Sequence, residues 1–205
     1  SLKKNITAML PPEVLAAYHH ALPYIANAMY GNPSSKLLVI GITGTKGKSS
    51  TAEMVNAIFE ESGRKTAVLN SIRFKIADSS KPNLTRLSMP GRFFIQKFLA
   101  DAVKAGCEVA IIEMTSEGAR QNRHRAIALD ALIFTNLAPE HVESHGSYQA
   151  YADAKFEIGK ALTHSSKRPR IMVANADDKE SSRYLTLAVE FQLPFSLSAQ
   201  KPYSS

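Results

Sequence analysis

The chain has 205 residues, of which 44% are hydrophobic and 21% are charged, and its formal net charge at pH 7 is +7. This composition is typical of a globular protein with one substantial core, and the single cysteine, Cys107, excludes a disulfide framework and a cysteine-rich zinc site. The basic residues are scattered without interleaved aromatic residues, so phosphate-rich small substrates are favoured over nucleic acid as the anionic partner.

The first 35 residues are predicted to form a helical extension followed by a linker. Residues 12–30, PEVLAAYHHALPYIANAMY, begin with a proline and are mostly apolar, which indicates a helix. His19, His20 and Pro23 interrupt this stretch, which is too short to span a bilayer. A helix that packs on the core is therefore favoured over one that lies in a membrane interface. The lone cysteine and the absence of a signal-peptide pattern predict a cytoplasmic protein.

From residue 36 to residue 205 the sequence alternates between apolar runs and helix-like stretches. The apolar runs are KLLVIGI, TAVLN, EVAIIEM, DALIFTN, RIMVAN and PFSLS, and the helix-like stretches cover residues 49–62, 91–105, 147–163 and 179–191. This order predicts an α/β fold, in which a mostly parallel sheet is covered by helices on both faces. Residues 70–90 break the alternation and predict an irregular hairpin or a loop insertion. Ligands of such sheets bind at the carboxyl ends of the strands.

A glycine-rich turn, GITGTKGKSS, connects the first apolar run to the first helix-like stretch. The backbone N–H groups of such a loop, together with the positive end of the following helix, bind phosphate. Lys48 is predicted to reach the β- and γ-phosphates of a nucleotide, and the Ser49 hydroxyl to ligate Mg²⁺. Ile42 stands where the strict phosphate-loop pattern has its first glycine, and Gly44 makes this turn a tighter variant. The turn predicts binding of ATP or GTP.

Three further side chains are candidates for chemistry at the same edge of the sheet. Glu113 ends the apolar run EVAIIE, where a carboxylate can hold a metal ion but can also only cap a neighbouring helix. His141 follows the strand end FTNLAPEH, and Lys155 lies in the helix-like stretch YQAYADAKFEIGKAL. Taken singly, His141 is by default a structural histidine and Lys155 a solvated lysine. The order and spacing of these residues along the chain must decide whether they belong to a site.

Four ordered segments resemble the Mur ligases, ATP-dependent enzymes that add amino acids to the peptidoglycan precursor, and within them the tripeptide synthetases. The segments are GITGTKGKSST, EMTSEGARQNR, FTNLAPEHVESHGSYQAYADAK and VANADDK, and the resemblance covers about residues 36–180. Ser49 and Ser50 replace the usual threonines of the family, and Lys46 stands where asparagine is common. Residues 117–119, Glu-Gly-Ala, depart from the usual His-Ala-Leu.

The resemblance implies a set of site residues at matching positions. The residues implied to bind the nucleotide are Gly44, Thr45, Lys46, Gly47, Lys48, Ser49, Ser50, Asn175 and Asp178. Those implied to hold or orient Mg²⁺ are Ser49, Glu113, His141 and Lys155, and those implied to be catalytic are Lys48, His141 and Lys155. The residues implied to bind a UDP-muramyl substrate are Ser88, Ser116, Gln121 and Arg123. Lys155 is implied to be carbamylated, because a carbamate is a hard oxygen ligand that suits Mg²⁺ whereas an amine is a poor one.

The implied reaction joins a substrate carboxylate to an amino acid through an acyl phosphate. Family members also have an N-terminal domain for the uridine end of the substrate and a C-terminal domain for the amino acid. Residues 36–205 are therefore expected to be a truncated central domain that alone turns over little substrate. Two alternatives stay open: a ligase like folylpolyglutamate synthetase, which shares the phosphate loop and the lysine, and a non-catalytic nucleotide-binding subunit.

Overall fold

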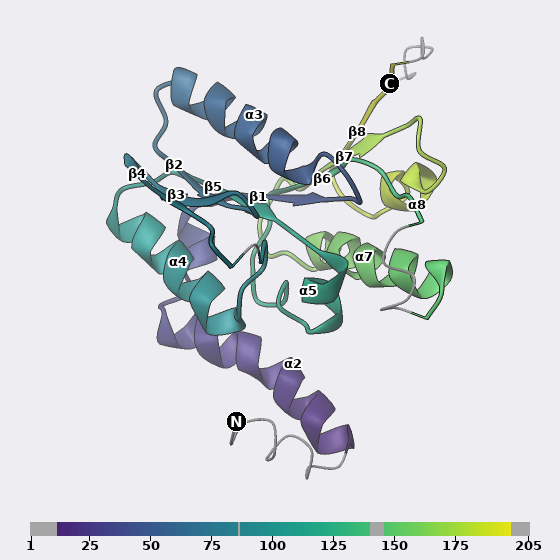
Figure 1. Ribbon diagram of the computed structural model, residues 1–205, viewed down its shortest axis with the longest axis horizontal. Coiled ribbons are helices and arrows are strands. Elements are labelled where there is room, and N and C mark those ends of the chain that lie inside the picture. Colours follow the sequence, from purple (N-terminus) through teal and green to yellow (C-terminus); the bar gives the residue numbers. More distant parts are fainter. Residues whose placement is uncertain (1–11, 86, 140–145, 198–205) are drawn as a thin grey trace.

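An eight-stranded sheet organises the residues that the computed structural model describes, which are 12–85, 87–139 and 146–197 (Figure 1). The strands are β1 (Leu38–Thr43), β2 (Thr66–Leu69), β3 (Arg73–Ile76), β4 (Ser79–Pro82), β5 (Val109–Glu113), β6 (Ala131–Phe134), β7 (Ile171–Asn175) and β8 (Phe191–Phe195). The helices are α2 (Pro12–Met29), the 3₁₀ helix η1 (Pro33–Lys36), α3 (Lys48–Glu61), α4 (Arg92–Lys104), α5 (Ser116–Arg120), α7 (Tyr148–Thr163) and α8 (Ser181–Leu185).

The strand order is β4-β3-β2-β5-β1-β6-β7-β8, and all neighbours from β2 to β8 are parallel. The antiparallel hairpin β3–β4 extends the sheet beyond β2 and confirms the hairpin predicted within residues 70–90. β1 lies between β5 and β6, with Ile42 opposite both Glu113 and Ile133. The chain leaves β1 toward a strand on one side and later returns to a strand on its other side, so the carboxyl end of β1 is a switch point at which ligands bind.

Helices cover both faces of the sheet, as predicted. In Figure 1, α3 lies on one face, whereas α4, α5 and α7 lie on the other and α2 packs outside α4. No helix of the described ranges is both long and apolar enough to cross a membrane.

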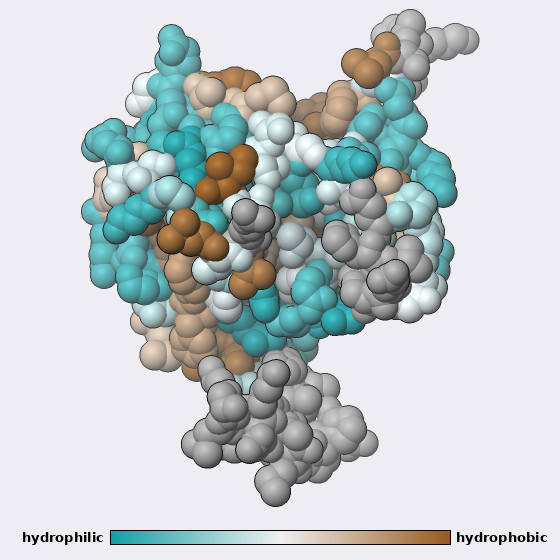
Figure 2. Space-filling view, in the orientation of Figure 1, coloured by the Kyte–Doolittle hydropathy of each residue, from teal (hydrophilic) through white to brown (hydrophobic). Residues whose placement is uncertain are grey.

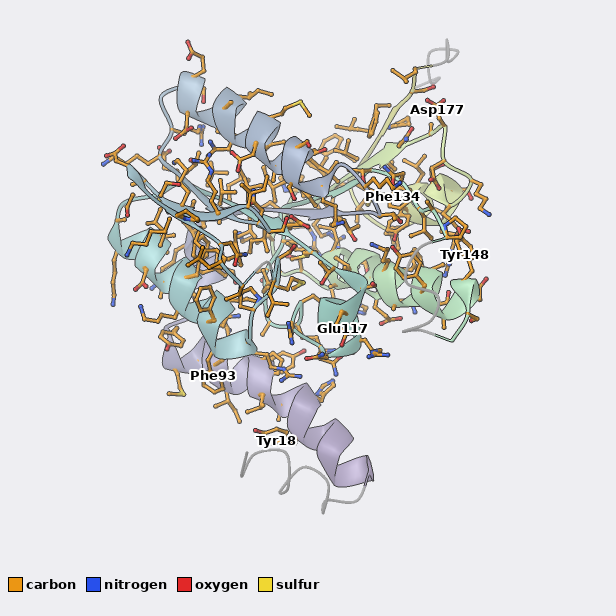
Figure 3. The ribbon with its side chains drawn as sticks, viewed as in Figure 1. Tyr18, Phe93, Glu117, Phe134, Tyr148 and Asp177 are labelled. Atoms are coloured by element: carbon orange, nitrogen blue, oxygen red, sulfur yellow. The ribbon has the colours of Figure 1, made fainter. Side chains whose placement is uncertain are left out.

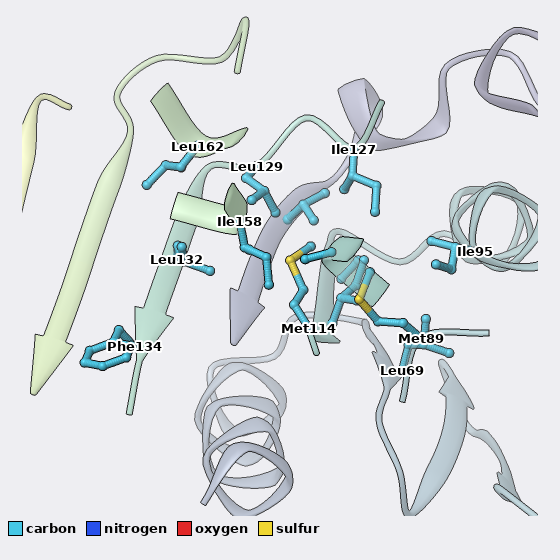
Figure 4. Close-up of a cluster of buried hydrophobic side chains, with 14 of the residues drawn as sticks. Leu69, Met89, Ile95, Met114, Ile127, Leu129, Leu132, Phe134, Ile158 and Leu162 are labelled. Carbon is cyan, nitrogen blue, oxygen red and sulfur yellow. The ribbon is translucent and has the colours of Figure 1, made fainter. Parts of the chain in front are cut away.

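The central strand β5 shows why the apolar runs are continuous. All five of its residues are buried. Val109 and Ile111 pack in the cluster under α3, whereas Ala110 and Ile112 belong to the larger cluster on the opposite face. Figure 4 shows other members of the larger cluster, among them Leu129 and Phe134. A strand that is buried on both faces needs apolar residues at every position rather than at every second one. On the outer surface, Figure 2 shows hydrophilic side chains with apolar ones in smaller patches among them.

Two predicted elements near the C-terminal end were placed wrongly. The stretch 179–191 forms only the short helix α8, and β8 begins at Phe191, before the predicted run PFSLS. The cause is an interaction that no local pattern shows. Glu190 accepts hydrogen bonds from the Arg170 guanidinium, at 2.8 and 3.0 Å, and this pair brings Phe191 beside Ile171 at the start of β7. Pro194 is tolerated in β8 because this strand is at the edge of the sheet.

Helix α8 is held to the sheet by aromatic stacking. The Tyr184 ring stacks on Phe134 with 4.1 Å between centroids, and the edge of Phe156 meets it at 5.4 Å. Tyr184 is 1% exposed, and its hydroxyl has no hydrogen-bond partner within the described part of the chain. The ring therefore stabilises the fold while the hydroxyl costs free energy, because it loses its water without gaining a partner.

We expect Tyr184→Phe to raise the free energy of unfolding by about 1 kcal/mol, since it removes an unsatisfied buried hydroxyl and keeps the ring. Tyr184→Leu, which removes the stacking, should lower it. Urea denaturation of the wild type and both variants measures these changes. A Phe variant that is less stable than the wild type would show that the hydroxyl has a partner.

Candidate functional site

The glycine-rich turn joins β1 to α3 at the carboxyl edge of the sheet. Gly44 and Gly47 both have positive φ angles, of 145° and 78°. A Cβ atom on Gly44 would overlap the hydroxyl of Thr135 and would lie 3.0 Å from the carbonyl oxygen of Asn136, whereas a Cβ atom on Gly47 would meet nothing within 4 Å. The first glycine is thus required by close packing against the end of β6, and the second by its backbone conformation.

The segment after β6 supports the turn from behind. The Thr45 amide donates to the Asn136 carbonyl at 2.8 Å, and the Lys46 amide donates to the Asn136 side chain at 3.0 Å. Thr135 Oγ1 in turn donates to the Lys46 carbonyl at 2.8 Å. The sequence analysis missed Thr135 and Asn136, although polar residues that end an apolar strand run are a signal that points to this edge.

Helix α3 begins at Lys48 with Gly47 as its N-cap, and no side chain caps its first amides. The N-terminal amides of such a helix are suited to an anion such as phosphate. The Lys48 ammonium lies in the same place: it donates to the Thr45 carbonyl at 2.8 Å and is 3.8 Å from Glu113 Oε1. Ser50 is exposed in the first turn of α3.

Glu113 is the centre of the site. Its side chain is nearly inaccessible, and it accepts hydrogen bonds from three serines that belong to different segments. Ser49 Oγ donates to Oε2 at 2.6 Å, Ser88 Oγ donates to Oε1 at 2.7 Å, and the Ser71 amide donates to Oε2 at 3.2 Å. The alternative that Glu113 only caps a helix is not what the structure shows. A hydroxyl and a carboxylate this close are the hard oxygen donors that Mg²⁺ prefers, so these residues fit that ion.

The predicted metal ligands other than Ser49 and Glu113 are only partly within the described residues. His141 lies outside the described residues. Within the described ranges, no group of three or more His, Cys, Asp or Glu side chains could hold a metal ion by itself. A Mg²⁺ ion that is bound through one or two protein oxygens and completed by phosphate oxygens and water does not need such a group.

Lys155 is not the solvated lysine that a lone helix position suggests. It is 2% exposed, and its ammonium donates a hydrogen bond to the Gly44 carbonyl in the glycine-rich turn. The Tyr151 ring lies 4.9 Å from the same ammonium, and the Tyr151 hydroxyl is 3.0 Å from Thr45 Oγ1. A signal for this burial was present in the sequence, because Lys155 shares the buried stripe of α7 with Tyr151, Ile158 and Leu162 at helical spacing.

The four predicted substrate residues lie on the segments beside Glu113. Ser88 contacts Glu113 directly, and Ser116 is buried at the start of α5. Arg123 donates to the Met89 carbonyl and, at 2.6 Å, to the side-chain oxygen of Gln121. Gly118 has a packing role in the same place, because a Cβ atom there would overlap the Met89 sulfur.

Asn175 and Asp178 contact the segment that supports the turn. Asn175 donates to the Thr135 carbonyl at 2.9 Å, and Asp178 accepts from the Leu137 amide at 2.7 Å. In this structure both side chains hold residues 135–137 in place. Their predicted contact with a nucleotide stays a prediction.

Comparison with known proteins places this arrangement in a family. Residues 42–202 match the Mur ligase middle domain. The chain belongs to that family. Among its relatives are a UDP-N-acetylmuramyl-tripeptide synthetase from Roseiflexus sp., 34% identical over 82% of this chain, and a UDP-N-acetylmuramoyl-L-alanyl-D-glutamate–2,6-diaminopimelate ligase from Bacillus velezensis, 31% identical over 89%. The chain spans only 35% and 37% of the length of these relatives.

Solved structures share the fold of this Mur ligase middle domain. A structure of a UDP-N-acetylmuramoyl-L-alanyl-D-glutamate–2,6-diaminopimelate ligase has a TM-score of 0.70 at 24% identity, over 80% of this chain and 32% of that one. The folylpolyglutamate synthase of Mycobacterium tuberculosis, solved with ADP and AMPPCP, has a TM-score of 0.61 at 17% identity, over 85% of this chain and 46% of that one. Both likenesses confirm the predicted α/β class with a mostly parallel sheet.

The basic segment after α5 contains a buried histidine. His124 is 3% exposed. Burial, and then the positive charge of Arg125, lower the pKa of His124 from 6.5 to about 4, while Glu157 acts in the opposite direction. The imidazole is therefore neutral in the folded Mur ligase middle domain at neutral pH and becomes protonated only as the pH falls toward about 4.

We expect Gly44→Ala to destabilise the domain more than Gly47→Ala does. Gly47→Ala should cost about 1–2 kcal/mol, because it places only a left-handed alanine in open space. Gly44→Ala adds the overlap with Thr135 to an unfavourable φ angle, so the turn must move. Thermal denaturation of both variants measures the difference, and equal losses of stability would contradict the packing role of Gly44.

His124 predicts a pH dependence of stability. Because its pKa is lower in the folded state, the unfolded chain binds a proton first as the pH falls below about 6.5. The His124 contribution is fully present above pH 6.5 and is lost progressively between about pH 6.5 and 4, by roughly 3 kcal/mol in total. Urea denaturation at several pH values should show a shallower decline for His124→Leu than for the wild type. The exposed His164→Gln is the control, and curves for His124→Leu and the wild type that run in parallel would contradict the assignment.

Proposed function

We propose that this chain is the ATP- and Mg²⁺-binding core of a Mur-type ligase that joins an amino acid to a UDP-muramyl peptide. One observation carries the proposal: Glu113 binds Ser49 at the start of α3 and Ser88 on the neighbouring segment, with Lys48 3.8 Å away. The start of α3, the Lys48 ammonium and two hard oxygen donors lie around one point, which supports binding of a nucleotide phosphate there. The names of the sequence relatives supply the substrate class, and the nucleotides in the related structures support ATP.

The proposed reaction has two steps. First, a substrate carboxylate oxygen attacks the γ-phosphorus of ATP, the bond to the bridging oxygen breaks, and ADP leaves. The amine of the amino acid then attacks the carbonyl carbon of the acyl phosphate, phosphate leaves, and the amine loses a proton as the amide forms. Lys48, released from the Thr45 carbonyl, would stabilise negative charge on the transferring group. Ser49 and Glu113 would hold Mg²⁺, which when bound supplies further charge neutralisation at the phosphates.

Lys155 is proposed to take part in metal binding beside the glycine-rich turn. Its buried ammonium already contacts the Gly44 carbonyl, so a negatively charged carbamate on the same nitrogen would lie beside the phosphate loop. We propose that Lys155 acts in the carbamylated form, together with His141, as an oxygen and nitrogen donor set for a metal ion. Asn175 and Asp178 are proposed to hold residues 135–137 in place at the edge of the sheet where the nucleotide would bind.

The domain boundaries and the location in the cell are also proposals. Residues 36–205 are proposed to be the central ATP-binding domain, because the family match runs from residue 42, within the glycine-rich turn, to residue 202. Residues 1–35 are proposed to be an extension that packs through α2 on α4. A nucleotide substrate and a single buried, reduced cysteine support a cytoplasmic location.

We expect the purified full-length protein to release phosphate when it is given ATP, Mg²⁺, UDP-N-acetylmuramoyl-L-alanyl-D-glutamate and a diamino acid. Lys155→Ala should lower this rate at least about tenfold, a loss of ~1.4 kcal/mol of transition-state stabilisation, without a matching loss of stability. Lys160→Ala is the matched control, because Lys160 lies on the same helix and its exposed ammonium pairs with Glu157.

Two other results would replace the proposal. Phosphate release with a folate and glutamate, but not with the muramyl substrate, would support the ligase like folylpolyglutamate synthetase. ATP binding without phosphate release from either substrate set would support a non-catalytic nucleotide-binding subunit.

A further inference from the structure

Arg92, which the sequence analysis did not single out, occupies an unfavourable place for a cation. It is the first residue of α4, and the first turn of this helix contains no acidic residue. The positive end of a helix dipole disfavours a nearby cation by a few tenths of a kcal/mol to about 1 kcal/mol. The helix end is therefore an unfavourable place for the charge of Arg92.

A second guanidinium lies beside it. Arg92 donates to the Gln121 carbonyl, while Arg123 reaches the opposite way to the Met89 carbonyl and to Gln121 Oε1. Both guanidiniums therefore bind Gln121, Arg92 at its backbone carbonyl and Arg123 at its side-chain oxygen. Phe93 in the first turn of α4 and Glu117 on α5 mark these two elements in Figure 3.

Both guanidiniums are half-buried. Burial lowers the pKa of Arg92, and the charge of Arg123 lowers it further, while Tyr18 acts in the opposite direction. Burial also lowers the pKa of Arg123, while Glu117 acts in the opposite direction. Two like charges that are brought together and partly dehydrated repel each other. Binding of an anion by the pair would reduce this repulsion.

The pair is next to the reacting centre. Met89, whose carbonyl binds Arg123, directly follows Ser88, and the Ser88 hydroxyl binds Glu113. Gln121 lies between the two arginines. An acidic substrate whose reacting carboxylate approaches the phosphate site at Glu113 would therefore bring its neighbouring groups to Arg92 and Arg123.

A purely structural role is the alternative. The two arginines connect residues 88–92 to residues 121–123 through hydrogen bonds to carbonyl groups, and a brace of this kind needs donors but not charge. Two adjacent guanidinium groups are costly if they only connect two segments. They are well suited to a carboxylate, which accepts hydrogen bonds from the paired N–H groups of guanidinium.

We propose that Arg92 and Arg123 together bind a non-reacting carboxylate of the acceptor substrate, with Arg92 as the second, specificity-determining cation. This inference rests on the proposed function. The acceptor named for the relatives ends in D-glutamate, which has two carboxylates. One of them would react with ATP, and the other would bind the two arginines.

The test is the binding of UDP-N-acetylmuramoyl-L-alanyl-D-glutamate to the full-length protein, measured by calorimetry. Arg92→Gln should raise the Kd at least about tenfold, Arg92→Lys should recover part of the loss, and the Kd for ATP should not change. Arg125→Gln is the matched control on the same segment, where Arg125 binds Asn122 and His20 instead. Thermal denaturation of each variant separates a lost brace from a lost ligand contact.

Two further ligands identify the anion. Against an acceptor whose non-reacting carboxylate is amidated, the wild type and Arg92→Gln should bind equally weakly. UDP alone should bind equally to both proteins, because its anionic groups are phosphates. If Arg92→Gln weakens UDP binding as much as acceptor binding, the anion is the diphosphate and the carboxylate assignment is wrong.

The outcomes separate this inference from the proposed function. A wild type that binds the acceptor, with Arg92→Gln binding it equally well, overturns the inference alone. A variant that loses stability and affinity for ATP and acceptor together shows a brace, and also overturns it. A wild type that binds no muramyl acceptor overturns the proposed function, and this inference with it.

Discussion

The buried carboxylate of Glu113 is the interaction on which the rest of the site depends. An ionised carboxylate in a nearly inaccessible place is costly unless hydrogen bonds and a nearby cation replace its water. Ser49, Ser71 and Ser88 supply hydrogen bonds from different segments of the chain, and Lys48 supplies the cation. Because each partner comes from a different segment, satisfying this one charge fixes the start of α3, the approach to the β3–β4 hairpin and the approach to α4 relative to one another.

Behind that carboxylate, a second set of contacts shapes the glycine-rich turn. Thr135 and Asn136 hold the turn from the β6 side, and they are themselves held by Asn175 at the end of β7. Lys155 and Tyr151 approach the turn from α7. The turn is therefore fixed by side chains from the segment after β6 and from α7, so a ligand that binds it meets a site that is already formed. Preorganised donors of this kind lower the cost of stabilising charge in a transition state.

The buried polar residues of this site share one property, which is that each has a hydrogen-bond partner. Glu113, Lys155 and Ser88 are each at least nine-tenths buried, and each has a hydrogen-bond partner across the site. Tyr184 shows the contrast, since its buried hydroxyl has no partner in the described part of the chain and its position is explained by its ring alone. Burial of polar groups is therefore offset by hydrogen bonds at the site, whereas at Tyr184 the packing of the ring offsets it.

The sequence by itself determined the α/β class, the position of the glycine-rich turn and the edge of the sheet where the candidate site lies, because strand runs, glycines and helix starts are local patterns. It also selected Glu113 and Lys155, but it could not say what they touch. The tertiary structure decided that Lys155 binds Gly44, that Asn175 and Asp178 hold the segment after β6, and that Arg92 lies beside Arg123. It also decided where β8 begins, through the pair of Arg170 and Glu190. These contacts join residues that are far apart in the chain or lie on different elements, and only the register of the parallel strands brings such residues together.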